Sequence, residues 1–333
     1  MRFLVLIFVL ILPSVASACE VSRPIVFAGL DWESAAFHNA VARFILENGY
    51  ECKTDAIPGS TIPMMQGVAQ GDIDVAMEVW KDNVTNVWQR ALEHGKVKEL
   101  GVNFPDAEQG WYVPRYLVEG DLERNIKPLA PGLKSVTDLP TYKDVFSDPE
   151  EKGKGRFYNC VAGWNCEVIN SAKLKAYGLS DYYTNFRPGT GAALAAAIGG
   201  AYLRGEPILA YYWTPTWVLG KYDLIQLNEP PWNQTDWDGL SADPEYPRAV
   251  AYPVVSVWIG VNTKFANNAP DLIKFLTAYA TSAALVNEAL SYMREHNVEA
   301  EDAARHFLSM YPKVWKSWVD ETIATRVQAA IPP

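Results

Sequence analysis

The stretch from Arg23 to Ile57, RPIVFAGLDWESAAFHNAVARFILENGYECKTDAI, contains the pattern on which the fold depends. Residues 23–30 are mostly apolar, which predicts a buried strand. Apolar residues then recur at helical spacing over 34–48, and Asn48-Gly49 is a typical helix stop. A second strand is predicted over 51–57. The order strand, helix, strand is a β-α-β unit, which predicts a parallel sheet.

The same alternation continues along the chain. A helix is predicted over 61–70 and a strand over 74–79. After a Pro- and Gly-rich stretch (127–132) and a charged stretch (148–155), the pattern restarts with a strand over 156–160, helices over 166–177 and 191–204, and a strand over 207–213. Residues 228–247 read as a long ordered loop, 254–261 as a strand, and 270–331 as helical with a break at Pro312. This pattern predicts an α/β protein with two lobes, each a mainly parallel sheet flanked by helices.

The length of 333 residues fits two lobes of ordinary size. We expect residues 19–115 and 250–333 to form the first lobe and residues 116–249 the second. The chain would then cross between the lobes twice, near 112–118 and near 248–254. Two domains in simple tandem are the alternative that the sequence leaves open.

The N-terminus, residues 1–18, has the features of a signal peptide. Arg2 is followed by the apolar run 3–12, by Pro13, and by the small residues Ala16-Ser17-Ala18. The apolar run is shorter than the roughly 20 residues that span a bilayer. These features predict a periplasmic, exported protein. Cys19 would follow the cleavage site, so a lipid-anchored form remains open.

The composition argues against several functions. The formal charge is −10, and removal of Arg2 with the signal peptide makes it −11. An acidic chain without Lys and Arg clusters is not expected to bind nucleic acid. The four His show no metal-ligand spacing, and no G-x-S-x-G motif occurs. We therefore expect no metal site, no cofactor and no enzymatic activity.

Four cysteines are present: Cys19, Cys52, Cys160 and Cys166. Four cysteines allow three pairings, and an oxidising compartment permits disulfides. Cys160 and Cys166 are close in sequence, which favours a local disulfide between them. Cys19 and Cys52 each lie at the entry to a predicted strand, so neighbouring parallel strands could bring them together. Four free buried thiols are the alternative.

Tryptophans stand at the ends of predicted strands. Trp80 ends one strand, Trp213 ends another, and Trp164 lies between a strand and a helix in CVAGWNC, residues 160–166. In open α/β sheets, ligands bind beyond the carboxyl ends of strands. Indole faces attract cations that cannot donate hydrogen bonds, with roughly 2 kcal/mol for a desolvated contact. The three tryptophans could line one pocket for such a cation, or they could be core residues.

The motif CVAGWNC, the motif YYWTPTW at 211–217, and Trp80 upstream resemble the glycine betaine/proline betaine-binding proteins of osmoprotectant ABC importers. Choline-binding relatives look similar at Trp32 and Trp80. The resemblance covers nearly the whole mature chain. It implies a periplasmic-binding-protein (Venus-flytrap) fold of type II, a monomer that closes on its ligand, and delivery of that ligand to an ABC permease.

The resemblance also implies roles for individual residues. Trp80, Trp164 and Trp213 match the three tryptophans that surround the trimethylammonium group. The backbone N–H groups of Asn165 and Cys166 match the donors to the ligand carboxylate. Both amides lie at a predicted helix N-terminus, which is by itself a favourable place for an anion.

Some positions depart from the betaine-binding pattern. Val84 occupies the place of a His that helps to hold the carboxylate in enterobacterial relatives. Glu78 would point to the same side of its strand as Trp80. Glu33 follows Trp32, where choline binders have an acidic residue. These carboxylates favour choline or another cationic ligand as an alternative, unless they are solvated rim residues.

Trp111 completes the candidate ligand-binding residues. A glycine betaine-like ligand remains the first expectation, because the helix N-terminus favours a carboxylate. A ligand-sensing module for a membrane receptor is a further alternative.

Overall fold

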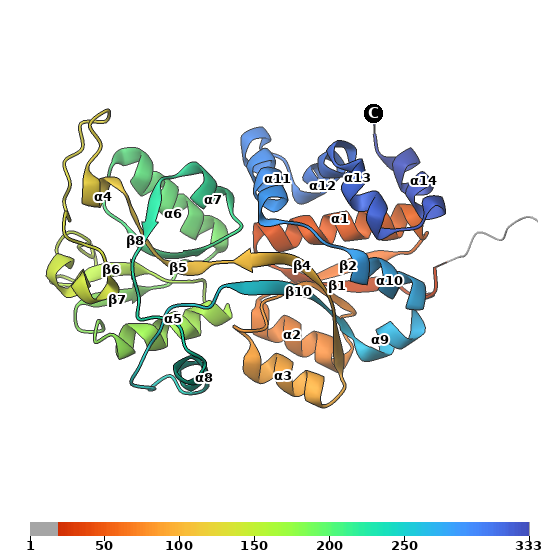
Figure 1. Cartoon of the computed structure of the whole chain (residues 1–333), viewed down its shortest axis with the longest axis horizontal. Coiled ribbons are helices and arrows are strands. Elements are labelled where there is room, and N and C mark those ends of the chain that lie inside the picture. The colour runs from red at the N-terminus through yellow and green to blue at the C-terminus, as the bar shows by residue number, and fades with distance from the viewer. Residues whose placement is uncertain (1–18, 333) are drawn as a thin grey trace, which may run out of the picture.

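A computed structural model describes residues 19–332, and the predicted signal peptide lies outside this range. Two lobes lie side by side, and each contains one five-stranded sheet with helices on both faces (Figure 1). The predicted α/β class and the two-lobed arrangement are therefore confirmed.

The first sheet has the strand order β2-β1-β3-β10-β4. Its strands are β1 (Ile25–Leu30), β2 (Thr54–Gly59), β3 (Val75–Val79), β4 (Val97–Ala107) and β10 (Val255–Asn262). The helices of this lobe are α1 (Glu33–Gly49), α2 (Thr61–Gln70), α3 (Thr85–Glu93), α9 (Thr263–Asn268), α10 (Pro270–Ala278), α11 (Ala283–His296), α12 (Ala300–Met310), α13 (Pro312–Trp315) and α14 (Glu321–Ala330), with the 3-10 turn η2 (Lys316–Trp318). Helix α1 lies on one face of the sheet under the C-terminal helices, and α2 and α3 cover the other face (Figure 1).

The second sheet has the order β7-β6-β8-β5-β9. Its strands are β5 (Gln109–Pro114), β6 (Gly155–Tyr158), β7 (Tyr183–Phe186), β8 (Leu209–Trp213) and β9 (Leu224–Gln226). Its helices are α4 (Tyr116–Glu119), α5 (Asn165–Ala176), α6 (Gly191–Arg204), α7 (Trp217–Lys221) and α8 (Gln234–Ala242), with the 3-10 helix η1 (Val136–Tyr142). Helices α6 and α7 lie on one side of this sheet, and α5 and α8 lie on the other (Figure 1).

One strand in each sheet runs against the others. Strand β10 is antiparallel to both of its neighbours, and so is β5. Each is the first strand after the chain has crossed from the other lobe, so no crossover helix within its own lobe orients it parallel to its neighbours. The sheets are therefore mixed, with four strands in one direction and one opposed.

The chain crosses between the lobes twice, and the first crossing is short. Strand β4 of the first sheet ends at Ala107 and β5 of the second sheet begins at Gln109. Strand β5 thus belongs to the second sheet although it lies within the range 19–115 that the sequence predicts for the first lobe. The return crossing lies between β9 and β10.

The segment 228–247 differs from its prediction. It contains helix α8, because the Asn233 side chain accepts a hydrogen bond from the backbone N–H of Asp236 and caps the helix. The boundaries of α2 and α6 match the predicted ranges exactly, and the predicted break at Pro312 separates α12 from α13.

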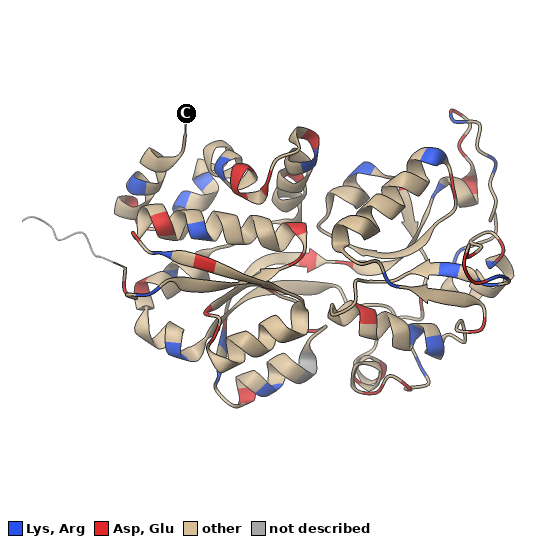
Figure 2. Cartoon of the chain, turned by 180° about the vertical axis from the view of Figure 1, so that it is seen from behind, with Lys and Arg blue, Asp and Glu red and all other residues tan. Residues whose placement is uncertain are grey.

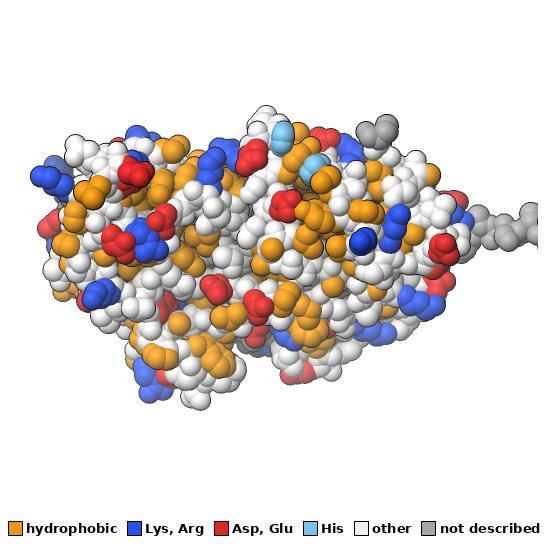
Figure 3. All heavy atoms as spheres, turned by 45° about the horizontal axis from the view of Figure 1, so that its top comes forward, with side chains coloured by type: hydrophobic (Ala, Val, Ile, Leu, Met, Phe, Trp, Pro, Cys, Tyr) orange, Lys and Arg blue, Asp and Glu red, His pale blue; other side chains and the backbone are white. Residues whose placement is uncertain are grey.

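Residues of both charge signs are spread along the chain in both lobes (Figure 2). On the face seen in Figure 3, basic side chains occur singly or in small groups among acidic, polar and apolar ones. Within residues 19–332 no helix has the length and apolar character needed to cross a membrane.

Candidate functional site

A cavity lies between the two lobes, and both lobes contribute to its wall. Its lining residues are Trp32, Thr61, Trp80, Asn83, Gln109, Trp164, Asn165, Cys166, Tyr211 and Trp213. Five of them are aromatic and none carries a charge at neutral pH. An apolar wall with a few uncharged polar groups is typical of sites for small organic ligands.

The four indoles of the cavity lie where parallel strands end. Trp32 follows β1, Trp80 follows β3, Trp164 lies in the loop after β6, and Trp213 is the last residue of β8. Strands β1 and β3 are parallel neighbours, as are β6 and β8. The carboxyl ends of the two strand pairs face each other across the cleft, which brings Trp80, Trp164 and Trp213 together as the sequence predicts.

The aromatic rings that surround the cavity pack against one another edge to face. The centroids of Trp32 and Trp164 are 5.4 Å apart at an interplanar angle of 75°, and those of Trp164 and Trp213 are 5.3 Å apart at 82°. Tyr211 stacks beside Trp213 with a centroid distance of 6.0 Å. Near-perpendicular rings present faces from several directions to one enclosed point, which suits a compact cation.

The indole N–H groups of Trp32, Trp80 and Trp164 donate to carboxylates outside the lining. Trp32 and Trp80 both donate to Oε2 of Glu78, at 2.8 and 3.0 Å. Trp164 donates to Oδ1 of Asp31 at 2.5 Å, which joins the two lobes. These bonds set the rotation of these three rings, so their π faces are held ready for a ligand.

The N-terminus of α5 supplies the hydrogen-bond donors of the second lobe. Trp164 is the N-cap residue, and its side chain makes no capping hydrogen bond. Asn165 and Cys166, the first two helical residues, line the cavity. First-turn amides of a helix have no intrahelical acceptor, and the helix dipole adds partial positive charge there. This end of the cavity can therefore hold a carboxylate without a basic side chain.

Uncharged polar side chains form another part of the wall. Gln109 Oε1 accepts from Asn83 Nδ2 at 2.9 Å and from the Tyr211 hydroxyl at 2.8 Å. Asn83 belongs to the first lobe and Gln109 to the second sheet, so this cluster also joins the lobes. Burial raises the pKa of Tyr211 well above its ordinary value, so the phenol stays neutral.

Both disulfides favoured by the sequence are present. Cys160 bonds to Cys166, and Cys19 bonds to Cys52. The Cys160–Cys166 bond closes the loop that carries Trp164, next to the cavity. The Cys19–Cys52 bond occupies the sulfur to which a lipid anchor would attach.

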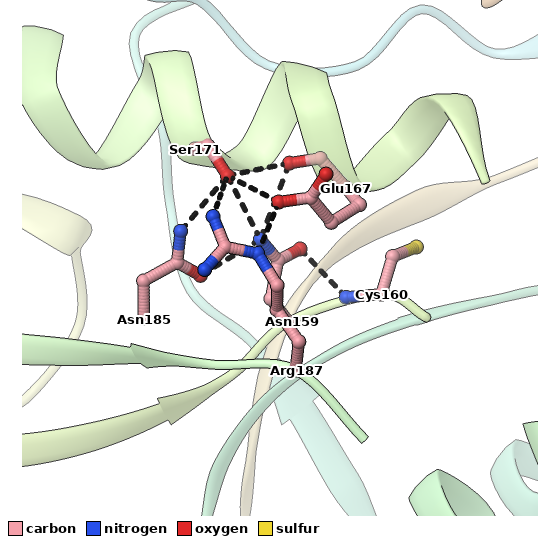
Figure 4. A network of polar contacts seen from close by, with 6 residues as sticks. All are labelled: Asn159, Cys160, Glu167, Ser171, Asn185 and Arg187. Atoms are coloured by element: carbon pink, nitrogen blue, oxygen red, sulfur yellow. Dashed lines mark hydrogen bonds and ion pairs between the residues drawn. The ribbon is translucent and has the colours of Figure 1, made fainter. Parts of the chain in front are cut away.

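A polar network lies behind the Trp164 loop (Figure 4). Oδ1 of Asn159 accepts from the backbone N–H of Cys160 at 2.6 Å, and its Nδ2 donates to Asn185 Oδ1 at 2.8 Å. The Ser171 hydroxyl donates to the carboxylate of Glu167, which also pairs with Arg187. Glu167 is an acidic residue in the first turn of α5, so its pairing with Arg187 offsets a charge that would oppose an anionic ligand group.

Loss of the Cys160–Cys166 bond is expected to weaken ligand binding. In a Cys160→Ser/Cys166→Ser variant the loop must be ordered on binding, at a cost of about 1 kcal/mol or more, which corresponds to about fivefold in Kd. Isothermal titration calorimetry measures this change. The matched control is Cys19→Ser/Cys52→Ser, which removes a disulfide away from the cavity and should leave Kd unchanged. Equal affinities of the two double variants would contradict a role of the loop disulfide in binding.

Three predicted site residues lie outside the cavity lining. Trp111 is fully buried in the second lobe, where its N–H donates to Asn170 and its ring packs on Phe157 at 4.1 Å. Glu33 is exposed in a neighbouring, more polar cavity. Glu78 lies behind the indoles and is 1% exposed, so it is not a solvated rim residue.

Sequence reasoning missed four residues of the wall: Thr61, Asn83, Gln109 and Tyr211. Tyr211 had a usable signal, since it precedes Trp213 by two in a strand and must share its face. Asn83 and Gln109 had none, because they meet only when the lobes come together. Val84, at the position of the missing His, is buried and does not line the cavity.

Comparison with known proteins identifies the class. Residues 23–310 match the model of the substrate-binding domain of ABC-type glycine betaine transport systems. The chain belongs to this family, which is a family of transport substrate-binding proteins.

Individual relatives agree with this assignment. A glycine betaine-binding periplasmic protein of Dickeya dadantii is 25% identical over 250 residues, which cover 72% of this chain and 70% of the relative. A trimethylamine N-oxide-binding protein of Pelagibacter ubique is 23% identical over 309 residues, which cover 90% and 92%. The solved structure of a choline-binding protein of an ABC transporter, in complex with choline, has a TM-score of 0.73 at 18% identity and covers 93% of this chain and 98% of its own. That structure supports the fold.

Proposed function

We propose that this chain is a periplasmic, monomeric binding protein that holds a quaternary ammonium compound of the glycine betaine type between its lobes and delivers it to an ABC permease. The observation that carries the proposal is the uncharged cavity with four indoles around it and a helix N-terminus at one side. A trimethylammonium group cannot donate hydrogen bonds, so ring faces are its best partners. The amides of Asn165 and Cys166 would receive the carboxylate.

We further propose that binding closes the two lobes. The hydrogen bonds from Trp164 to Asp31 and from Asn83 to Gln109 each connect one lobe with the other, and all four residues lie in or beside the cavity. A ligand that touches both walls would favour the closed arrangement. The lobes would consist of residues 19–108 with 250–332 and of residues 109–249, because β5 pairs in the second sheet.

Choline is the second candidate ligand. Two observations favour it: the cavity has no basic side chain for a carboxylate, and the carboxylate of Glu78 lies behind two of the indoles. A ligand with a net positive charge would gain more from Glu78 than a zwitterion does.

A screen by thermal unfolding and calorimetry tests the proposal. The panel contains glycine betaine, proline betaine, carnitine, choline, trimethylamine N-oxide and basic amino acids. A ligand present at 100 times its Kd raises the free energy of unfolding by about 2.7 kcal/mol. We expect stabilisation by a quaternary ammonium compound and none by arginine or lysine. Stabilisation by the basic amino acids alone would reject the proposal.

A further inference from the structure

Glu78 is a buried carboxyl group that does not line the cavity itself but contacts two of the indoles that do. It lies on β3, and its side chain is 0% exposed. Oε2 accepts both indole N–H groups, from Trp32 and Trp80. Oε1 accepts no hydrogen bond within the described residues, and Nε2 of His38 lies 3.9 Å from it.

No cation balances this carboxyl group in the part of the chain that the structure describes. From α1, His38 and the Ser34 hydroxyl face it, and from the end of α10 the Tyr279 phenol does so. His38 Nδ1 lies 2.8 Å from the Tyr279 hydroxyl. Burial lowers the pKa of His38 to about 3, so the imidazole is neutral at neutral pH. Burial also raises the pKa of Tyr279, so the phenol is neutral.

A buried carboxyl group without a counter-charge favours its protonated form. Burial raises the pKa of Glu78, and the hydrogen bonds from Trp32 and Trp80 oppose this only in part. A cation held against the same two indoles changes the balance, because a positive charge near the carboxyl group favours ionisation. None of the lining side chains carries a negative charge that could balance the cation.

We propose that Glu78 is the counter-charge of the cation and that it gives up its proton when a quaternary ammonium group enters the cavity. This inference rests on the proposed function. The proton leaves Oε1, the oxygen that bonds to neither indole, and passes to solvent as the ligand binds. The carboxylate keeps accepting both indole N–H groups through Oε2, so the rings stay in place. Glu78 is thus a positioning and charge-setting residue that favours ligands with a positive group.

The sign of the pH dependence follows from this linkage. Below the pKa of Glu78 in the liganded protein, the group is protonated in both states and affinity is lowest. Between the pKa of the liganded protein and the higher pKa of the empty protein, binding releases up to one proton. Affinity therefore rises with pH there, by at most about tenfold per pH unit. Above the pKa of the empty protein, Glu78 is ionised with and without ligand, so affinity is highest there and no longer changes with pH through this group.

Calorimetry of the whole protein with choline and with glycine betaine tests the proposal. Titrations at one pH in buffers of different ionisation enthalpy count the protons released, and the count is repeated from acidic to neutral pH. We expect release of up to one proton by wild type. The Glu78→Gln variant should release none, and its affinity should stay near the wild-type low-pH value at every pH. The side-chain amide oxygen of this variant can still accept hydrogen bonds from both indole N–H groups.

The matched control is Glu99→Gln. Glu99 also accepts an indole N–H, from Trp88 at 3.0 Å, and pairs with Lys81, but it does not line the cavity. This variant should release protons as wild type does. A second readout needs no variant: the infrared carbonyl band of a protonated carboxyl group should disappear when choline binds.

Three outcomes would overturn the inference. Wild type could bind a quaternary ammonium ligand without proton release at every pH tested, or Glu78→Gln could keep the wild-type pH dependence. In both cases the proposed function stands. Absence of binding by any quaternary ammonium ligand to folded wild-type protein would instead reject the proposed function, and the inference with it.

Discussion

Replacement of Trp164 by alanine is expected to weaken binding of glycine betaine or choline by more than tenfold. Each desolvated contact between an indole and a cation contributes roughly 2 kcal/mol, and about 1.4 kcal/mol corresponds to a factor of ten in Kd. Trp164 stands between the rings of Trp32 and Trp213 and donates to Asp31 of the other lobe. Its removal therefore opens the aromatic wall of the cavity and breaks a contact between the lobes.

Trp80→Ala and Trp213→Ala should each weaken binding by about tenfold or more, for the same reason. Calorimetry gives Kd, and quenching of tryptophan fluorescence gives an independent reading. The control is Trp232→Ala, because Trp232 is 43% exposed and does not line the cavity. If two of the three cavity variants bind as tightly as wild type, the cavity lined by the four indoles is not the binding site.

The convergence of the indoles was predictable because it depends on local rules. Trp80 and Trp213 each end a strand that shows in the sequence as an apolar run, and parallel strands place their carboxyl ends on one edge. Trp111 shows where this reasoning fails. It is as aromatic as the others, but β5 runs against its neighbours, so its first residue, Gln109, lies at the cavity and Trp111 lies further inside the second lobe. Only the crossing of the chain between lobes determines the direction of β5.

The setting of Glu78 needed the tertiary structure for another reason. Its position two residues before Trp80 predicts that both point to the same side. Whether that side is solvent or interior depends on Trp32, which comes from a loop 46 residues earlier and donates to the same oxygen. A strand pattern cannot contain that information. The clustering of Asn83 with Gln109 is hidden in the same way, since the two residues belong to different lobes.

The second large effect concerns the carboxylate of a zwitterionic ligand. Asn165→Pro is expected to weaken binding of glycine betaine by about tenfold or more and to affect choline much less. The substitution removes one backbone N–H, and a hydrogen bond to a charged group contributes about 1.5–3 kcal/mol. Choline has no carboxylate, so it does not depend on this donor. The ratio of the two affinities should therefore shift towards choline.

The local geometry makes this substitution mild for the fold. Asn165 is the first residue of α5, the position that proline tolerates best in a helix. Trp164 before it has φ −81° and ψ 144°, an extended conformation that a following proline permits. Asn165→Ala is the matched control, because it removes the side-chain amide and keeps the backbone N–H. If both variants lower the affinities for glycine betaine and choline by the same factor, the α5 amide does not hold a carboxylate. If only the proline variant changes the ratio of the affinities for glycine betaine and choline, the donor to the carboxylate is the backbone N–H at the N-terminus of α5. A carboxylate site of this kind needs no basic side chain, which explains why Val84 can stand where relatives have a His.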